Sequence, residues 1–191
     1  MYRKVLFFWR TWAAGLLLLQ AANATVVPQF SFEQLTDSSE MIATGTVARS
    51  WSAWDSAHKY IWTHYELTVT AAHKGAAVVK LEFAEPGGSL DGAVVNVAGS
   101  VGYAPGDHVT VFLERMPNGY LRTTGWEQGK YMMDSAGRLH APVMKGGDSV
   151  VAVSDKAAAT SLRSLEGMTL RDFGQMVAAR VRASQGQGGG K

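Results

Sequence analysis

The sequence predicts a mainly β protein, a small closed or partly open β-barrel of about five or six antiparallel strands with one helix before it and one after it. Three observations support this class. Short runs of β-branched and aromatic residues alternate with polar ones, turn residues separate the runs closely, and no regular alternation of strands with long helices occurs. A β-sandwich is the alternative topology.

The first 24 residues read as an export signal. Basic residues, an apolar run and a small-residue cleavage site follow one another: Arg3, Lys4 and Arg10, then 12–19, then Ala22-Asn23-Ala24. The alternative, an uncleaved anchor, needs about 20 apolar residues, whereas Arg10 interrupts the stretch here. We expect cleavage before Thr25, no membrane span afterwards, and a periplasmic or secreted protein.

Charge and cysteine content exclude several classes of function. The leader holds three basic and no acidic residues, so its removal changes the net charge from +2 to −1. A nucleic-acid partner, which requires a clustered basic face, is therefore not expected. The chain has no cysteine. This excludes thiol catalysis, thiolate zinc sites and disulfides.

The N-terminal third predicts a short helix followed by a long β-hairpin. Ser31 and Gln34 have the spacing of a capping box, which predicts a two-turn helix over 32–39. Strands are expected over 41–54 and 60–72, on either side of a polar break at 55–58. In the second strand one parity should face the core: Ile61, Thr63, Tyr65, Leu67, Val69 and Ala71.

Further strands follow at 78–83, 94–97, 108–115, 120–124, 130–133 and 138–140, separated by turn residues. The hairpin joined by Pro117-Asn118-Gly119 carries the strongest turn signal. The barrel domain is thus expected over 25–145 and a connector over 146–168. A helix capped by Thr169 should run to 183, and a glycine-rich disordered tail should occupy 184–191. Its apolar stripe predicts packing on the sheet, with an exposed partner-binding helix as the alternative.

The order of motifs in 25–133 resembles the start of the tissue inhibitors of metalloproteinases, and also a broader group of exported bacterial proteins of poorly characterised function. The matching segments are Thr25-Val26-Val27-Pro28, 32–35, Met41-Ile42-Ala43-Thr44-Gly45-Thr46-Val47, Tyr65-Glu66-Leu67-Thr68-Val69 and Lys74-Gly75. The resemblance implies an OB-like five-stranded barrel.

The same resemblance implies that the first mature residues enter a protease cleft, where the terminal amine and carbonyl bind the catalytic zinc. Thr25, Val27 and Pro28 match that ridge, with Val26 between them. The family begins its mature chain with a cysteine and pins it by disulfides, whereas here Ala24 precedes Thr25 and no cysteine exists. Without those staples we expect a more mobile N-terminal strand. The alternative is an ordinary leader into the first helix.

No catalytic signature is present in the sequence, and we expect no enzyme activity, cofactor or metal. His64 and Glu66 lie two apart on one predicted strand face and could share a metal or a proton. A solvated strand face is the preferred interpretation, because no second ligand pair at useful spacing is visible in the sequence. An enzyme is the third hypothesis, because sites assembled from distant residues leave no local motif.

Aromatic residues are densest in the first hairpin, at Trp51, Trp54, Tyr60 and Trp62. They predict either packing at the barrel end or a stacking surface for a ligand. The leading functional hypothesis is a noncatalytic exported module that binds protein, of the peptidase-inhibitor type, through Thr25 to Pro28. Its partner would be an extracytoplasmic protease or another envelope protein. The alternative is a cell-envelope glycan-binding or structural module that uses the four aromatic residues.

Overall fold

The computed structural model describes residues 28–141 and 161–188, and within them the protein is mainly β. An antiparallel sheet of seven strands has the order β3-β2-β1-β6-β8-β9, and β7 also pairs with β6. A separate two-stranded ladder joins β4 and β5. The strands are β1 (Met41–Trp54), β2 (Ile61–Lys74), β3 (Lys80–Pro86), β4 (Gly88–Leu90), β5 (Ala93–Val95), β6 (His108–Arg115), β7 (Leu121–Thr123), β8 (Lys130–Met133) and β9 (Leu139–His140).

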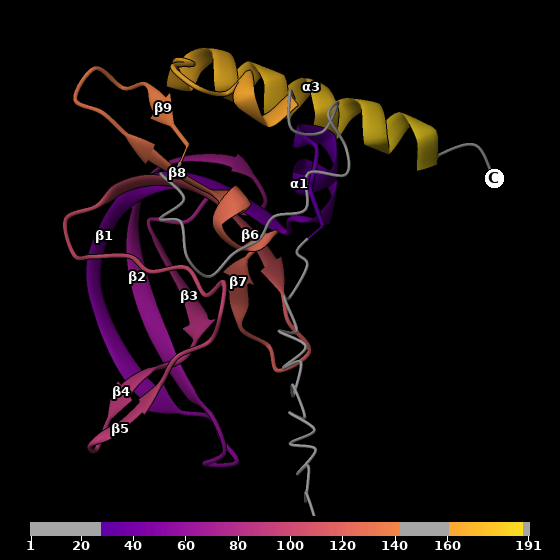
Figure 1. Ribbon diagram of the computed structural model, residues 1–191. Coiled ribbons are helices and arrows are strands. Elements are labelled where there is room, and N and C mark those ends of the chain that lie inside the picture. The colour runs from indigo at the N-terminus through magenta and orange to yellow at the C-terminus, as the bar shows by residue number, and fades with distance from the viewer. Residues whose placement is uncertain (1–27, 142–160, 189–191) are drawn as a thin grey trace, which may run out of the picture.

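The long β1–β2 hairpin that the sequence predicted is confirmed, and it bends strongly through the molecule (Figure 1). Ile61, Tyr65 and Leu67 are buried, as the alternation predicted. The predicted 108–115, 120–124, 130–133 and 138–140 strands correspond to β6, β7, β8 and β9. Two elements were missed, the short strand β4 and the 3-10 helix η1 (Trp126–Gly129), because each is held by tertiary contacts and has no periodicity of its own.

The expected closed barrel is not found, because β3 and β7 share no backbone ladder in the described part of the chain. The two strands nevertheless come within 8 Å of each other, Cα to Cα. A side chain joins them: the backbone N–H of Thr123 donates to Glu85 Oε1 over 2.8 Å. We call this junction between β3 and β7 the seam. The carboxyl group of Glu85 thus takes the place that a backbone carbonyl would hold in a continuous sheet.

Two apolar clusters share the sheet between them. The first fills the concave side of β1, β2, β3 and β6, with Val47, Leu67, Phe83, Val109 and Leu113 among its buried members. The second lies between the other face of the sheet and the helices, which gather at one end of the molecule (Figure 1). The central strands β1 and β6 contribute buried side chains to both clusters, so apolar burial holds these two strands from both sides.

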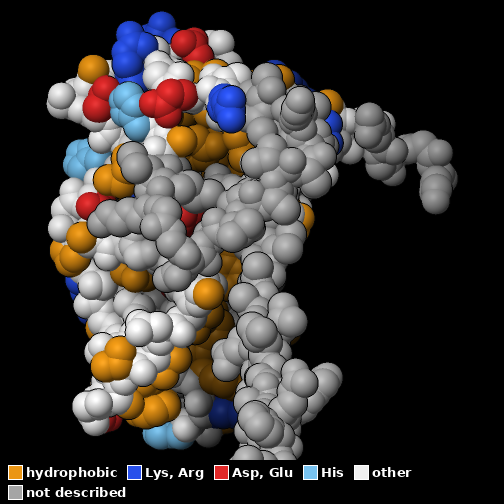
Figure 2. All heavy atoms as spheres, viewed as in Figure 1, with side chains coloured by type: hydrophobic (Ala, Val, Ile, Leu, Met, Phe, Trp, Pro, Cys, Tyr) orange, Lys and Arg blue, Asp and Glu red, His pale blue; other side chains and the backbone are white. Residues whose placement is uncertain are grey.

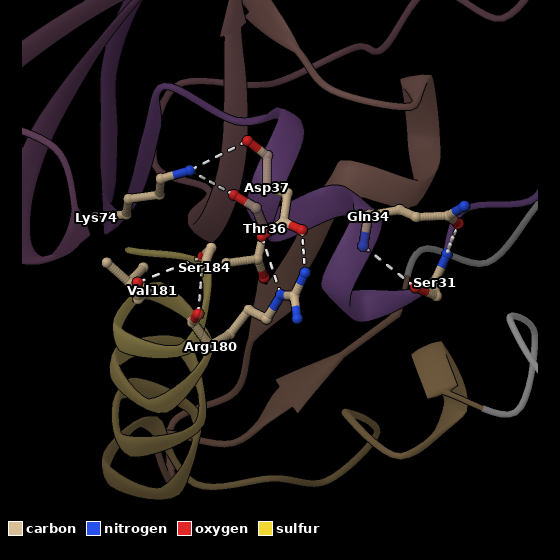
Figure 3. Close-up of polar contacts among 8 residues, drawn as sticks. All are labelled: Ser31, Gln34, Thr36, Asp37, Lys74, Arg180, Val181 and Ser184. Carbon is tan, nitrogen blue, oxygen red and sulfur yellow. Dashed lines mark hydrogen bonds and ion pairs between the residues drawn. The ribbon is translucent and has the colours of Figure 1, made fainter. Parts of the chain in front are cut away.

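Helices α1 (Phe32–Ser38) and α3 (Leu170–Gly188) pack together on the sheet. The predicted capping box is confirmed, with reciprocal bonds between Ser31 and Gln34 (Figure 3). Phe173 of α3 is fully buried, and its ring meets Phe32 of α1 and Phe112 of β6 edge to face. The C-terminal helix is consequently a core element, as its apolar stripe indicated.

Polar contacts fasten α1 to α3 and to β2 (Figure 3). Arg180 forms an ion pair with Asp37, and Lys74 Nζ donates to the carbonyl oxygen of Thr36 over 2.7 Å. The helix ends at Gly188, beyond residue 183, so residues 184–188 are helical where a disordered tail was expected. Ser184 Oγ donates to the carbonyl oxygen of Arg180 over 2.9 Å, which supports this last turn.

The connector predicted over 146–168 is only partly within the described residues. Its last segment, from residue 161, is ordered by two buried leucines, Leu162 and Leu165, which belong to the second apolar cluster. Backbone bonds tie it to β9, with Leu139 N–H donating to Met168 and Gly167 N–H to Leu139. The signal peptide and the 145/146 boundary lie outside the described residues. Within the described ranges, no helix combines the length and the apolarity needed to cross a membrane.

Candidate functional site

The candidate site lies on the outer face of β2, beside the seam. Trp62 and His64 share this face because side chains two apart on a strand point the same way. Trp51 of β1 is the direct cross-strand partner of His64, and Ala84 of β3 is its partner on the other side. Aromatic and small side chains therefore meet across three strands.

His64 is held on three sides and is only 7% exposed. Its ring stacks on Trp51, with centroids 5.3 Å apart and an interplanar angle of 13°, and meets Tyr120 edge to face at 5.1 Å. Its Nδ1 lies 3.0 Å from Glu82 Oε1. Because an ionised carboxylate only accepts, Nδ1 carries the proton in this contact, and Nε2 is an acceptor whenever the ring is neutral. That Nε2 has no hydrogen-bond partner among the described residues.

Tyr120 reaches the site from the turn between β6 and β7. The side chain of Ala84 is small, and this leaves room for Tyr120 to lie across β3 and contact both His64 and Trp62. A cavity of about 260 Å³ opens beside these contacts. We call it the groove; its walls are His64, Glu82, Phe83, Ala84, Arg115, Gly119, Tyr120 and Leu121.

The charges around the groove are mostly paired. Arg115 donates to both carboxylate oxygens of Glu40 and to the carbonyl oxygen of Gly119. Glu66, on the same strand face as His64, accepts from Lys80 and Arg49, and these two bonds lower the pKa of its carboxyl group. Glu82 differs, because its side chain is 58% exposed and its Oε2 has no partner within the described part of the chain.

The less favoured interpretation, a metal or proton shared between His64 and Glu66, is not what the structure forms, and the preferred solvated face does not hold for His64, which is buried. Glu66 is bound by Lys80 and Arg49, and Glu82 takes the place beside His64. Among the residues that the structure describes, no group of three or more His, Asp or Glu side chains could hold a metal ion. Register explains the difference, since Glu82 on β3 lies diagonally opposite His64, a contact invisible in one strand's sequence.

The four predicted aromatic residues do not form one surface. Trp51 and Trp62 lie on the groove side, whereas Trp54 points to the opposite face of β1 and stacks on His58. Tyr60 lies beside the β1–β2 turn and is 54% exposed, with Lys59 Nζ 5.0 Å from its ring centroid. Sequence reasoning missed the roles of Glu82 and Tyr120, and the only local hint was an aromatic residue directly after the Asn118-Gly119 turn.

The N-terminal candidates Thr25, Val26 and Val27 lie outside the described residues, and the structure begins at Pro28. Gln128 of η1 anchors the segment that follows. Its Nε2 donates to the carbonyl oxygen of Pro28 over 3.0 Å, and its Oε1 accepts from the N–H of Phe30 over 2.9 Å and from Gln29 Nε2 over 3.1 Å. Gln128 is only 8% exposed, so the start of the described chain is fixed to the sheet without a disulfide.

Charged side chains gather at the end of the molecule away from β4 and β5 (Figure 2). There His140 lies between two carboxylates, with Nε2 3.0 Å from Asp134 and Nδ1 2.7 Å from Glu166. The hydrogen bonds that His140 donates to Asp134 and, to a lesser extent, to Glu166 raise the pKa of its imidazole. This cluster joins the β8–β9 hairpin to the segment before α3, and we interpret it as a structural contact.

Comparison of the chain with protein-family models, with curated proteins and with solved structures found no match. The features that bear on function are therefore the geometry of the groove and that of the anchored N-terminal segment.

Proposed function

We propose that the protein is an exported, noncatalytic binding module with an OB-like barrel, and that the groove binds a glycan of the cell envelope. The succession β1-β2-β3, followed by β6 beside β1 and β7 beside β3, supports the OB-like assignment. OB barrels bind oligosaccharides and oligonucleotides on the face of their second and third strands, with the loop between the last two strands. The groove occupies the corresponding position, between β2, β3 and the β6–β7 turn.

One observation carries the glycan proposal: half-buried aromatic rings lie beside unused hydrogen-bond acceptors. Trp62 and Tyr120 offer apolar ring surface, and His64 Nε2 and Glu82 Oε2 offer acceptors without partners among the described residues. A sugar combines a face of C–H groups with a rim of hydroxyl donors, and it fits such a site. A nucleic acid fits poorly, because the expected mature chain has a net charge of −1 and the groove has no unpaired basic group in the described structure.

The test is a calorimetric titration of the protein starting at Thr25 with oligosaccharides derived from envelope glycans. Tyr120→Ala and Trp62→Ala should each weaken binding about fivefold or more, by analogy with the 1–3 kcal/mol that stacking of a nucleic-acid base on an aromatic ring contributes. Trp54→Ala is the matched control, because Trp54 lies on the other face of β1. Equal losses in the control, or no binding of any oligosaccharide by the native protein, would contradict the proposal.

A second function, inhibition of a zinc peptidase by the mature N-terminus, is favoured by the anchoring of residues 28–30 to Gln128. Because residues 28–30 are already held by Gln128, binding of the residues before them to a partner would cost less conformational entropy than binding of a wholly free segment. The N-terminal amine and carbonyl of Thr25 would then bind zinc at an open coordination position. The partner would be an extracytoplasmic protease or another envelope protein.

This second function is tested by mixing the protein starting at Thr25 with purified zinc endopeptidases. Inhibition should disappear when one residue is added before Thr25, because the amine then moves out of register with the zinc. Gln128→Ala should weaken inhibition without unfolding the protein, as checked by circular dichroism. Inhibition that survives the added residue would exclude binding through the amine.

A further inference from the structure

We propose that the groove selects glycans that donate hydrogen bonds and carry no negative charge, so that amino sugars bind best and acidic sugars worst, with Glu82 as the residue that sets this preference. The inference rests on the proposed glycan binding and adds the chemical class of the ligand. It follows from the pairing of charges around the groove and from the kind of hydrogen-bonding groups left unused there.

The groove has an uncompensated negative charge within the described structure. Arg115, the basic residue in its wall, is engaged by both oxygens of Glu40 and by the carbonyl of Gly119. The carboxyl group of Glu82 has one hydrogen-bond partner, Nδ1 of His64, and its side chain is otherwise 58% exposed. An anionic sugar would therefore meet a carboxylate, with no free guanidinium to compensate.

The unused polar atoms in the groove are acceptors. In the neutral imidazole, a proton on Nδ1 that is donated to Glu82 leaves His64 Nε2 as an acceptor, and Glu82 Oε2 is a carboxylate oxygen. A ligand must therefore donate to both. Vicinal hydroxyl groups do so, and an ammonium group does so with a favourable charge, whereas carboxylate and phosphate groups offer only acceptors.

The size of the preference follows from the exposure of Glu82. Two unit charges about 4 Å apart in water interact by about 1 kcal/mol, which corresponds to about a fivefold change in the dissociation constant. An amino sugar should thus bind about fivefold more tightly than its neutral N-acetylated form, and an acidic sugar about fivefold more weakly. Since Glu82 is exposed, both differences should shrink in 1 M salt.

The experiment compares three trisaccharides by calorimetry: chitotriose, its fully N-acetylated form and trigalacturonate. The native protein should bind them in that order. Glu82→Gln keeps an oxygen that accepts from His64 Nδ1 and removes the charge, so the three affinities should converge to within about twofold. Glu114→Gln is the matched control, because it removes one negative charge at a residue that does not line the groove.

Tight binding of trigalacturonate, or an unchanged order of affinities in Glu82→Gln, would overturn the inference while leaving glycan binding intact. Binding of none of the three sugars, nor of any oligosaccharide in the wider titration, would overturn the proposed function itself. The two failures are therefore distinguishable. Circular dichroism and thermal unfolding of each variant verify that changes in affinity do not come from loss of the fold.

Discussion

Replacing Glu85 by Gln should remove a large pH dependence from the stability of the protein. Glu85 is 1% exposed, and its Oε1 accepts the N–H of Thr123 across the seam. Its Oε2 is buried without a hydrogen-bond partner. Burial away from water penalises the charged form and raises the pKa of this carboxyl group from 4.5 to about 7, although the hydrogen bond from Thr123 opposes the rise.

The magnitude follows from linkage between proton binding and folding. A raised pKa means that the folded protein holds the proton more tightly than the unfolded chain, so the contribution is complete below pH 4.5 and is lost as the pH rises through 7. A shift from 4.5 to about 7, at 1.36 kcal/mol for each unit, corresponds to about 3 kcal/mol of unfolding free energy. In Glu85→Gln the side-chain oxygen still accepts the N–H of Thr123, and there is no charge to bury. The unfolding free energy of the variant should therefore not fall by this amount as the pH rises through 7.

The assay is urea unfolding of the native protein and of Glu85→Gln at intervals between pH 4 and pH 8.5. The difference between the two unfolding free energies cancels the other titrating groups, and it should grow in favour of the variant by about 3 kcal/mol across this range. The difference in unfolding free energy at pH 4, where Glu85 is protonated, measures the effect of the new amide group at the seam. It is separate from the change in this difference with pH, which measures the ionisation of Glu85. A difference that stays constant from pH 4 to pH 8.5 would refute the argument that Glu85 is a buried carboxyl group.

Phe173→Ala should lower the unfolding free energy by about 3–5 kcal/mol, because the ring is fully buried between α1 and β6; a loss below 1 kcal/mol in urea unfolding would mean that α3 is not a core element. Gly45→Ala should cost about 1–3 kcal/mol or more, since a Cβ there would overlap the carbonyl of Thr68, whereas Gly102→Ala should be nearly neutral by the same measurement. Proton NMR should give His140 a pKa above its usual 6.5, and Asp134→Asn should lower it.

Much of the fold was predictable because the spacing of apolar residues along a single segment distinguishes a strand from a helix and indicates which face is buried. The alternation over 60–72 placed Ile61, Tyr65 and Leu67 in the core, and the capping box placed the start of α1. The apolar stripe of the C-terminal helix predicted that this helix packs on the sheet, and Phe173 of α3 is fully buried. These signals work because a strand repeats every two residues and a helix every 3.6, so a single segment contains the information.

The candidate site was less predictable, because none of its contacts lies within one segment. His64, Glu82 and Tyr120 come together through the β2–β3 register and through the position of the β6–β7 turn over Ala84. Trp54 was grouped with Trp51 by proximity in sequence, although their positions on β1 place them on opposite faces. The hydrogen bonds by which Gln128 anchors residues 28–30 were not predicted, because a single glutamine beside glycines carries no sequence signal for a long-range contact.

The seam and the groove are two sides of one junction, and this couples them. On the inner side Glu85 holds Thr123, and on the outer side Tyr120, three residues before Thr123, lies over β3 against His64. Whatever draws β7 away from β3 must also withdraw Tyr120 from the groove. Ionisation of Glu85 as the pH rises through about 7 leaves a charge buried at the junction, which favours a separation of β7 from β3 that lets water reach the carboxylate. Glycan affinity should therefore fall between pH 6 and pH 8.5 in the native protein and stay level in Glu85→Gln. If calorimetry gave the same dependence of glycan affinity on pH for the native protein and for Glu85→Gln, the ionisation of Glu85 would not be coupled to binding in the groove.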